Sequence, residues 1–171
     1  LARRGALAEV VVSRAPAIDA AELDRSVSRA GIAAPVRVET RPPLEWLAPD
    51  GGEAAATEQA WVAAGTASLE VAATGIPACV VWRTDRIGYA VARRLVRGRF
   101  AGLPNRLLGR EALPERLQDA LTAPDLVRVS EELRRPEAFA RAAAAAAELR
   151  SRLGGPGFAD RLARLIDEVV R

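Results

Sequence analysis

The sequence contains no lysine, histidine or methionine, and its only cysteine is Cys79. Without histidine and with one thiol, it offers no credible zinc site and no Ser-His or Cys-His nucleophile pair. A single cysteine forms no internal disulfide, which fits a reducing compartment. Cys79 lies in an apolar run, so we expect a buried packing residue rather than a reactive thiol. We expect a site that uses neither a metal ion nor a cofactor.

Aromatic residues are also scarce, at 4% of a chain in which half of the residues are hydrophobic. Alanine, leucine and valine must therefore fill the interior, with Trp46, Trp61 and Trp82 as the large exceptions. A length of 171 residues allows one domain with a real core. No apolar run approaches the length of a membrane span, and we expect no signal peptide. Because the chain begins at Leu1 and lacks methionine, we expect a fragment of a longer protein.

Apolar, β-branched runs alternate with segments of helical spacing along the first part of the chain. The pattern predicts strands at 9–13, 36–39, 60–63, 78–82 and 99–103, and helices at 19–30, 53–58, 66–74 and 86–96. Asp19 is the expected cap of the first helix. The stretch 41–52 is rich in proline and glycine and is typical of a loop. Such alternation favours a parallel sheet covered by helices, with ligands at the carboxyl ends of the strands.

After Pro104 the pattern is entirely helical. It predicts helices at 122–133, 137–153 and 158–170, the first of them capped by Thr122 with Asp125 at the capping-box position. We therefore expect a sheet domain over residues 1–121, and C-terminal helices over 122–171 that pack on it or on a preceding domain.

The strand at 60–63 leads directly into a turn of small residues, and a helix follows. The stretch is Ala64-Gly65-Thr66-Ala67-Ser68-Leu69-Glu70. Gly65 would let a ligand approach the backbone, and Thr66 or Ser68 could cap the first turn of the helix. The orphan N–H groups and the helix dipole would attract a phosphate. Glu70 could accept hydrogen bonds from vicinal hydroxyls such as those of a ribose. An ordinary strand-to-helix turn with a solvated glutamate is the other interpretation, and the local pattern alone favours it.

Three further motifs follow at characteristic spacing. They are Pro77-Ala78-Cys79-Val80-Val81-Trp82-Arg83, Leu103-Pro104-Asn105 and Pro114-Glu115-Arg116-Leu117-Gln118. Together with the turn, this set resembles the C-terminal half of lipid-A-disaccharide synthase, closely over residues 61–121. That family has Ser-Gly-Thr-Ala-Thr-Leu-Glu, Pro-x-Val-Val-x-Tyr-Arg, Leu-Pro-Asn and Pro-Glu-Leu-Leu-Gln. The departures are Ala64 for serine, Ser68 for threonine, Trp82 for tyrosine, and Arg116 for an apolar residue.

The resemblance implies the donor-binding half of a GT-B glycosyltransferase, a Rossmann-like parallel sheet with helices on both faces and a helical C-terminal tail. It also implies UDP-2,3-diacylglucosamine as donor, 2,3-diacylglucosamine 1-phosphate as acceptor, and inversion without a metal. The family's first strand, its glycine-rich turn and its catalytic carboxylate lie before the region matching Leu1. No catalytic residue is therefore expected here, and we expect no synthase activity from the chain alone.

By this resemblance, several residues would bind the nucleotide sugar. They are Gly65, Thr66, Ala67, Ser68, Glu70, Arg83, Asn105, Glu115 and Gln118. Structural interpretations remain for some of them. Asn105 could be a turn residue at a strand end, Arg83 a surface residue, and Glu115 and Gln118 a solvated pair on one helical face.

The segment 83–110 holds eight arginines and one acid, Asp85, interleaved with aromatic and aliphatic residues. A basic amphipathic segment can lie on an anionic membrane, so we expect Arg93, Arg94, Arg97 and Arg99 to contact lipid. A helix packed on the sheet with solvated arginines is the alternative. The resemblance implies a cytoplasmic protein at the inner face of the bacterial inner membrane. Since the net charge is only +3 and no nucleic-acid motif is present, we expect no nucleic-acid partner.

Two other functions fit the same sequence. One is a non-catalytic nucleotide-binding or interaction module on this fold. The other is a different UDP-sugar enzyme, such as an epimerase.

Overall fold

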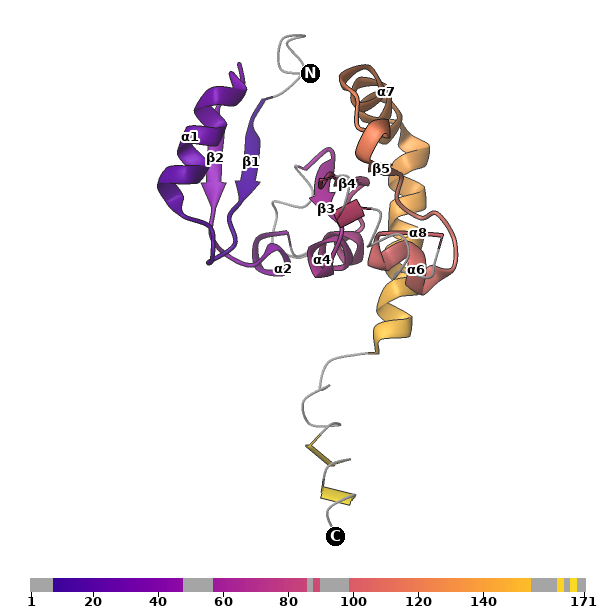
Figure 1. Ribbon diagram of the computed structural model, residues 1–171. Helices are drawn as coiled ribbons and strands as arrows, with labels where there is room; N and C mark the ends of the chain where they lie inside the picture. Colours follow the sequence, from indigo (N-terminus) through magenta and orange to yellow (C-terminus); the bar gives the residue numbers. More distant parts are fainter. Residues whose placement is uncertain are drawn as a thin grey trace.

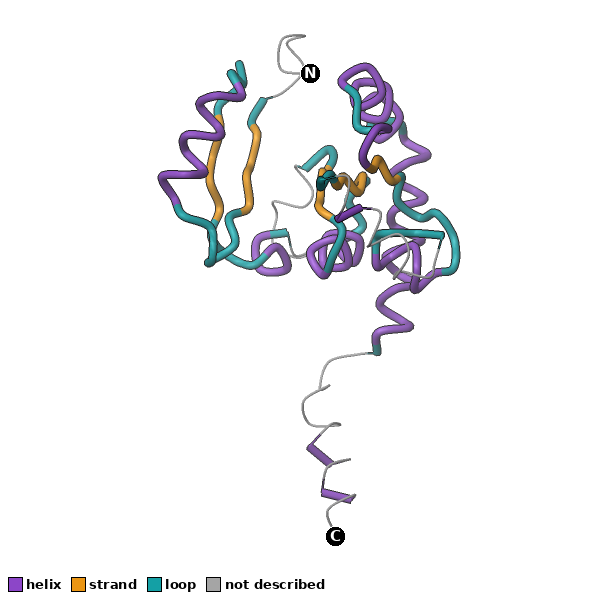
Figure 2. The backbone as a smooth tube through the Cα atoms, in the orientation of Figure 1, coloured by secondary structure: helices purple, strands orange, loops and turns teal. Residues whose placement is uncertain are grey.

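The computed structural model describes residues 8–47, 57–85, 88–89, 99–154, 163–164 and 167–168. Strands alternate with helices early in the chain, and the last two elements of the described part are longer helices (Figures 1 and 2). The elements are β1 (Val10–Ser13), α1 (Ala20–Ala30), β2 (Val36–Glu39), α2 (Pro43–Trp46), β3 (Ala60–Ala63), α4 (Thr66–Thr74), β4 (Ala78–Trp82), α6 (Leu103–Leu108), β5 (Glu115–Leu117), η2 (Gln118–Ala120), α7 (Ala123–Leu133) and α8 (Pro136–Leu153).

The described strands pair in parallel, in two groups. In the first group β1 pairs with β2, and Val10 lies opposite Val36. In the second group β4 lies between β3 and β5, with Val80 opposite both Val62 and Glu115. This arrangement confirms the predicted α/β class, with parallel strands flanked by helices and a helical C-terminal part.

Local signals set several element boundaries as predicted. Asp19 caps α1 by accepting a hydrogen bond from the Glu22 amide at 2.9 Å, and Gly31 ends that helix at a φ of 58°. The Thr122 hydroxyl accepts from the Asp125 amide at 3.4 Å and caps α7. The predicted strands at 36–39, 60–63 and 78–82 coincide with β2, β3 and β4.

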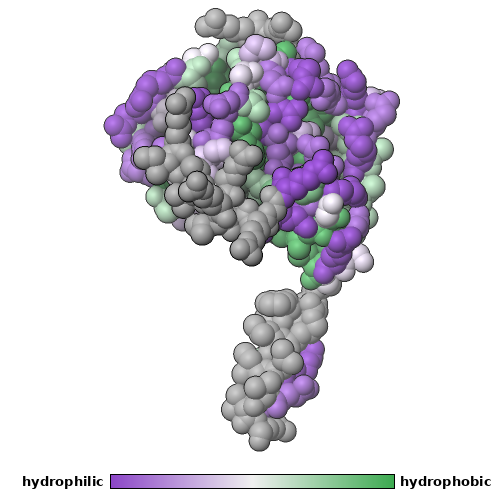
Figure 3. Space-filling view, turned by 45° about the vertical axis from the view of Figure 1, so that its right-hand side comes forward, coloured by the Kyte–Doolittle hydropathy of each residue, from purple (hydrophilic) through white to green (hydrophobic). Residues whose placement is uncertain are grey.

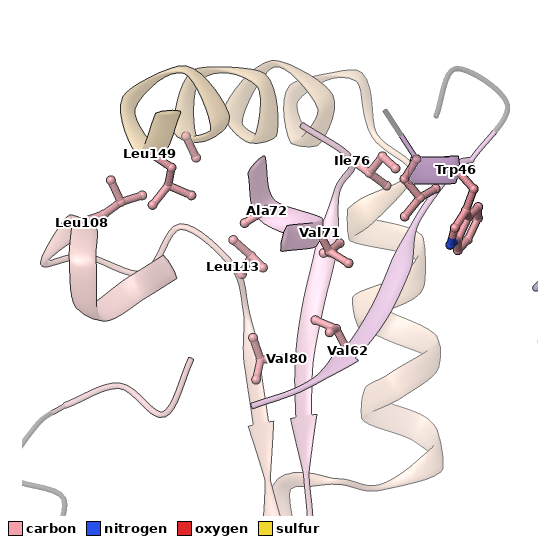
Figure 4. Close-up of a cluster of buried hydrophobic side chains, with 12 residues drawn as sticks. Trp46, Val62, Val71, Ala72, Ile76, Val80, Leu108, Leu113 and Leu149 are labelled. Atoms are coloured by element: carbon pink, nitrogen blue, oxygen red, sulfur yellow. The ribbon is translucent and has the colours of Figure 1, made fainter. Parts of the chain in front are cut away.

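The core forms where α4 and α8 pack beside the β3–β4–β5 group. Figure 4 shows Val62 and Val80 from the strands, Val71 from α4 and Leu149 from α8 in one cluster. Gly75 ends α4 at a φ of 85°, and an added Cβ there would lie 3.6 Å from the Ala143 Cα. Small residues therefore let the two helices approach closely. On the face shown in Figure 3, hydrophilic residues dominate the described surface.

Three sequence predictions are wrong. Residues 99–103 form no strand, because the Ala101 and Gly102 amides donate to the Glu115 carboxylate and α6 begins at Leu103. The chain after Pro104 is not entirely helical, since β5 pairs with β4. The stretch 41–52 contains a short helix, α2, that begins at Pro43 and buries Trp46.

Other predictions fall partly or wholly outside the described residues. These are most of the helices at 86–96 and 158–170, and residues 53–56 of the helix at 53–58. Thr57 and Glu58, at the described end of that last helix, are not helical. The division into domains at residue 121 stays a prediction.

Candidate functional site

The carboxyl ends of β3, β4 and β5 bring the predicted site residues to one edge of the sheet. The register pairs Ala63 with Val81 and Trp82 with Leu117, so the three strands end side by side. The Gly65 turn follows β3, Arg83 follows β4, and Gln118 follows β5. This edge is where ligands bind in parallel α/β proteins.

At this edge, Gly65 shapes the start of α4. Its φ of 147° is strained for residues with a side chain. Apart from its two chain neighbours, no atom of the described residues lies within 4 Å of an ideal Cβ, so these residues leave the space at the turn open. The Thr66 and Ala67 amides stand in the first helical turn, where N–H groups have no intrahelical acceptor. Ser68 is buried, and its hydroxyl donates to the Gly65 carbonyl at 2.6 Å. The predicted capping by Thr66 or Ser68 is therefore wrong, because Gly65 itself is the N-cap.

Glu70 lies one turn into α4 and is half-buried. Among the residues that the structure describes, its carboxylate has no hydrogen-bond or ion-pair partner. Arg83 is exposed and likewise has no partner in the described part of the chain.

Gln118 joins the ends of β4 and β5. Its amide oxygen accepts from the Thr84 N–H at 2.8 Å, and its amide nitrogen donates to the Thr84 carbonyl at 3.0 Å. Gln118 has a φ of 51°, which makes it the one described non-glycine residue in the left-handed region. Such backbone strain gathers at functional sites. The predicted pairing of Glu115 with Gln118 on one helical face is wrong, because Glu115 lies in strand β5 and Gln118 is the first residue of η2.

Asn105 belongs to α6 and is fully buried, rather than lying at a strand end as predicted. Its oxygen accepts from the Ala112 and Leu113 amides at 2.7 and 2.9 Å. Its nitrogen donates to the Leu113 carbonyl and to Glu115 Oε1, both at 2.7 Å. These bonds saturate the amide, so a direct ligand contact would require one of them to break.

The Glu115 carboxylate organises the loop before α6. It accepts from the Ala101 amide at 2.8 Å, from the Gly102 amide at 3.0 Å, and from Asn105. A Cβ at Gly102 would lie 3.0 Å from the Val80 side chain and 3.2 Å from Glu115 Oε1. Gly102 was not among the predicted site residues, although a glycine just before Leu-Pro-Asn was a usable signal for such close packing.

Two other predicted features have clear environments. Cys79 is buried, as predicted, and this burial raises the pKa of its thiol to about 12. Arg116, an arginine where the resemblance expects an apolar residue, forms an ion pair with Asp125 on α7. The pKa of the Asp125 carboxyl is lowered, chiefly by its hydrogen bond from Arg128 and also by Arg116.

A pocket of about 250 Å³ lies at the opposite edge of the sheet. Its lining includes Pro77 and Pro114, the residues just before β4 and β5, as well as Arg116 and Arg141. Because it borders the amino ends of the strands, it is separate from the turn at Gly65.

The parallel strands, the flanking helices and the small-residue turn at a strand's carboxyl end define a Rossmann-like α/β protein. The family model described as lipid-A-disaccharide synthetase matches residues 38–144. The chain belongs to this family.

Relatives named lipid-A-disaccharide synthase support the same assignment. The one from Myxococcus xanthus is 37% identical over 166 residues, which are 95% of this chain and 40% of that protein. The one from Granulibacter bethesdensis is 44% identical over 68 residues, 40% of this chain and 17% of the relative. The chain therefore spans less than half the length of these relatives. No solved structure matches it significantly.

Proposed function

We propose that this chain is the nucleotide-sugar-binding half of a lipid-A-disaccharide synthase. The donor would be UDP-2,3-diacylglucosamine and the acceptor 2,3-diacylglucosamine 1-phosphate. The observation that carries the proposal is that the family match includes both the Gly65 turn and Gln118, which share one sheet edge. The two alternative functions have no comparable observation in their favour.

In the proposed reaction, UDP leaves as the acceptor hydroxyl attacks the donor's anomeric carbon with inversion. The diphosphate gains charge as the glycosidic bond breaks, and preorganised donors lower that barrier most effectively. The Thr66 and Ala67 amides, with the positive end of the α4 dipole, would hold the diphosphate. Arg83 would add a full charge, and Glu70 would accept hydrogen bonds from the ribose hydroxyls.

Asn105, Glu115 and Gln118 have a different part in this proposal. Their side chains are engaged with backbone groups of the protein, so we assign them to positioning. Gln118 sets the end of β4, from which Arg83 projects. Glu115 and Asn105 set the loop before α6. Direct contact of these three residues with the nucleotide sugar stays a prediction.

Calorimetric titration with UDP tests the site. We expect weak binding of UDP that is stronger than that of ADP. Glu70→Ala should weaken it by about tenfold or more, since a hydrogen bond to a charged group contributes about 1.5–3 kcal/mol. Glu137→Ala, which removes an exposed carboxylate from the start of α8, is the matched control. Equal affinity for ADP, or no effect of Glu70→Ala, would contradict the proposal.

The chain alone should not form the disaccharide, because the resemblance puts the general base outside it. The test incubates residues 1–171 with both lipid substrates in detergent and follows the disaccharide by mass spectrometry. Product above the level of a protein-free control would show that the chain carries its own base.

We further propose that the protein works at the inner face of the inner membrane, where acylated substrates reside. No described helix is both long enough and apolar enough to cross a bilayer. Of the four arginines expected to contact lipid, only Arg99 lies within the described residues. It is exposed, and its guanidinium lies 5.5 Å from the centre of the Phe100 ring. The other three, Arg93, Arg94 and Arg97, lie outside those residues.

A further inference from the structure

The pocket at the amino ends of the strands has no part in the proposed function. Its volume is about 250 Å³. Close-packed protein interiors leave few voids larger than a water molecule, and an apolar cavity of about 150 Å³ already holds one benzene. The pocket is therefore large enough for a small organic molecule.

The floor of the pocket is apolar. α4 contributes Ala72 and Ile76, and α7 contributes Leu133, all of which are buried. α8 contributes Ala138, Ala142 and Ala145. These three alanines lie on one face of the helix, because they are spaced by four and three residues. Their short side chains leave room between α8 and the strands, and a floor of this kind suits an aliphatic group.

Arg116 brings a largely buried cation to the wall of the pocket. Its side chain is only 17% exposed. Its Nε donates to Asp125 and its Nη1 donates to the Glu115 carbonyl at 2.9 Å, whereas no described residue accepts a hydrogen bond from its Nη2. A guanidinium N–H is a strong donor to an anion. Since the resemblance expects an apolar residue at this position, the cation is a departure of this chain from the family pattern.

Three more charged side chains line the pocket, namely Glu111, Glu132 and Arg141. Glu132 is engaged, because its Oε1 accepts from Arg128 at 2.6 Å. Glu111 and Arg141 are exposed, and neither has a hydrogen-bond or ion-pair partner in the part of the chain that the structure describes. The lining thus holds two arginines and two glutamates and has no net charge. It offers donors to an anion and an acceptor to a cation.

We propose that this pocket binds a small aliphatic zwitterion of the α-amino acid class. The carboxylate of the ligand would accept hydrogen bonds from Arg116 Nη2 and from Arg141. Its ammonium group would donate to Glu111, and its side chain would lie on the apolar floor. The site lies at the opposite edge of the sheet from the Gly65 turn, so it does not depend on the proposed nucleotide site.

Charge complementarity favours a zwitterion over a singly charged ligand. A monocarboxylate of the same shape would lie near the Glu111 carboxylate without an ammonium group to compensate it. A monoamine would likewise lie near two guanidinium groups. Either one leaves a charge of the pocket unpaired on partial desolvation, which costs free energy.

An NMR titration of the 171-residue chain tests the site, with L-leucine as the probe. We expect saturable shifts of the Ala72, Ala138 and Ala142 amides, with a dissociation constant of about 1 mM or below. The amides of α1, which contributes no residue to the pocket, should not shift. Isocaproate lacks the ammonium group of leucine, and isopentylamine lacks its carboxylate. Each should bind at least about tenfold more weakly, because each loses hydrogen bonds to charged groups.

Substitutions separate the two charged contacts. Arg116→Leu should weaken the binding of L-leucine by at least about tenfold. Glu111→Gln should lower the affinity for L-leucine toward that for isocaproate, and should leave isocaproate binding no weaker. Arg106→Leu, at an exposed arginine outside the pocket lining, is the matched control and should change nothing. If Arg116→Leu loses the native spectrum, Arg141→Gln at an exposed position tests the same carboxylate contact.

Three results would overturn the proposal. The first is the absence of saturable shifts at about twenty times the expected dissociation constant. The second is binding of isocaproate as tight as that of L-leucine, which would mean that the ammonium group is not recognised. The third is an unchanged affinity for L-leucine in folded Arg116→Leu and Arg141→Gln. A failure of UDP to bind would count against the proposed function and leave this proposal standing.

Discussion

At the scale of single residues, Asn105 shows how a polar side chain can specify a local structure. It is the only asparagine in the chain, and it is fully buried. Its side chain accepts hydrogen bonds from two backbone amides and donates to one carbonyl and one carboxylate. A buried amide group without a partner costs free energy, so these bonds also protect the backbone of Ala112 and Leu113. The same residue therefore holds the turn between α6 and β5 and steadies the Glu115 carboxylate.

We predict that Asn105→Ala lowers the free energy of unfolding by about 3 kcal/mol. The change leaves buried backbone groups unpaired and opens a small cavity. Urea unfolding followed by circular dichroism measures the effect. Arg106→Ala, at the exposed neighbouring position of α6, should change stability by less than about 0.5 kcal/mol. A loss below about 1 kcal/mol for Asn105→Ala would mean that the turn holds without this side chain.

At the scale of elements, the end of β2 depends on one carboxylate. Glu39 is buried, and its Oε1 accepts from the Thr40 and Arg41 amides, both at 2.9 Å. Its Oε2 accepts from the Arg41 guanidinium at 2.6 Å. The side-chain bond from Arg41, with the backbone amides, lowers the pKa of Glu39 from 4.5 to about 2. The ionised carboxylate therefore stabilises the end of β2 and the turn that leads to α2.

This arrangement predicts a pH dependence of stability. Because the folded pKa is lowered, the contribution is complete above the unfolded value of 4.5 and is lost as the pH falls toward about 2. Glu39→Gln should destabilise the protein at pH 7, and its difference from wild type should shrink between about pH 5 and pH 2. Urea unfolding across this range tests it, with Glu45→Gln at an exposed site of α2 as control. A difference that stays constant with pH would contradict the assigned pKa.

At the scale of the whole molecule, the proposed binding to an anionic membrane depends on where the arginines lie in the chain. All basic residues are arginine and the net charge is only +3, so attraction to an anionic surface requires a local cluster. The segment 83–110 is such a cluster in sequence. Each arginine near an anionic surface contributes about 1 kcal/mol, and salt screens that attraction.

We predict that the chain sediments with anionic phospholipid vesicles at low salt, and that replacing Arg93, Arg94, Arg97 and Arg99 with glutamine releases it. The matched control replaces four exposed arginines elsewhere with glutamine, namely Arg25, Arg29, Arg135 and Arg141. It makes the same change in net charge and should leave binding largely intact. An equal loss of vesicle binding in both variants would indicate that overall charge, not this segment, attracts the protein to the vesicles. If the native chain does not bind vesicles at all, the segment has a structural role instead.

The sequence by itself determined the features that depend on neighbouring residues. The apolar runs of β2, β3 and β4 were predicted at their observed bounds, as were the caps at Asp19 and Thr122 and the turn at Gly65. Caps and buried strands are encoded within a few positions, so periodicity and turn chemistry suffice to find them. The small-residue turn, with the motifs after it, was also enough to indicate the family.

Only the tertiary structure decided the roles of Asn105, Glu115 and Gln118. Asn105 bonds to the Leu113 carbonyl, 8 residues away in the sequence, and Glu115 bonds to the Gly102 amide, 13 residues away. Gln118 bonds to Thr84, 34 residues away. The spacing of three residues predicted that Glu115 and Gln118 share one face of a helix. In the structure, Glu115 instead lies in β5, which pairs with β4. Strand pairing is a contact between distant segments, and no local pattern encodes which edge a short run will join.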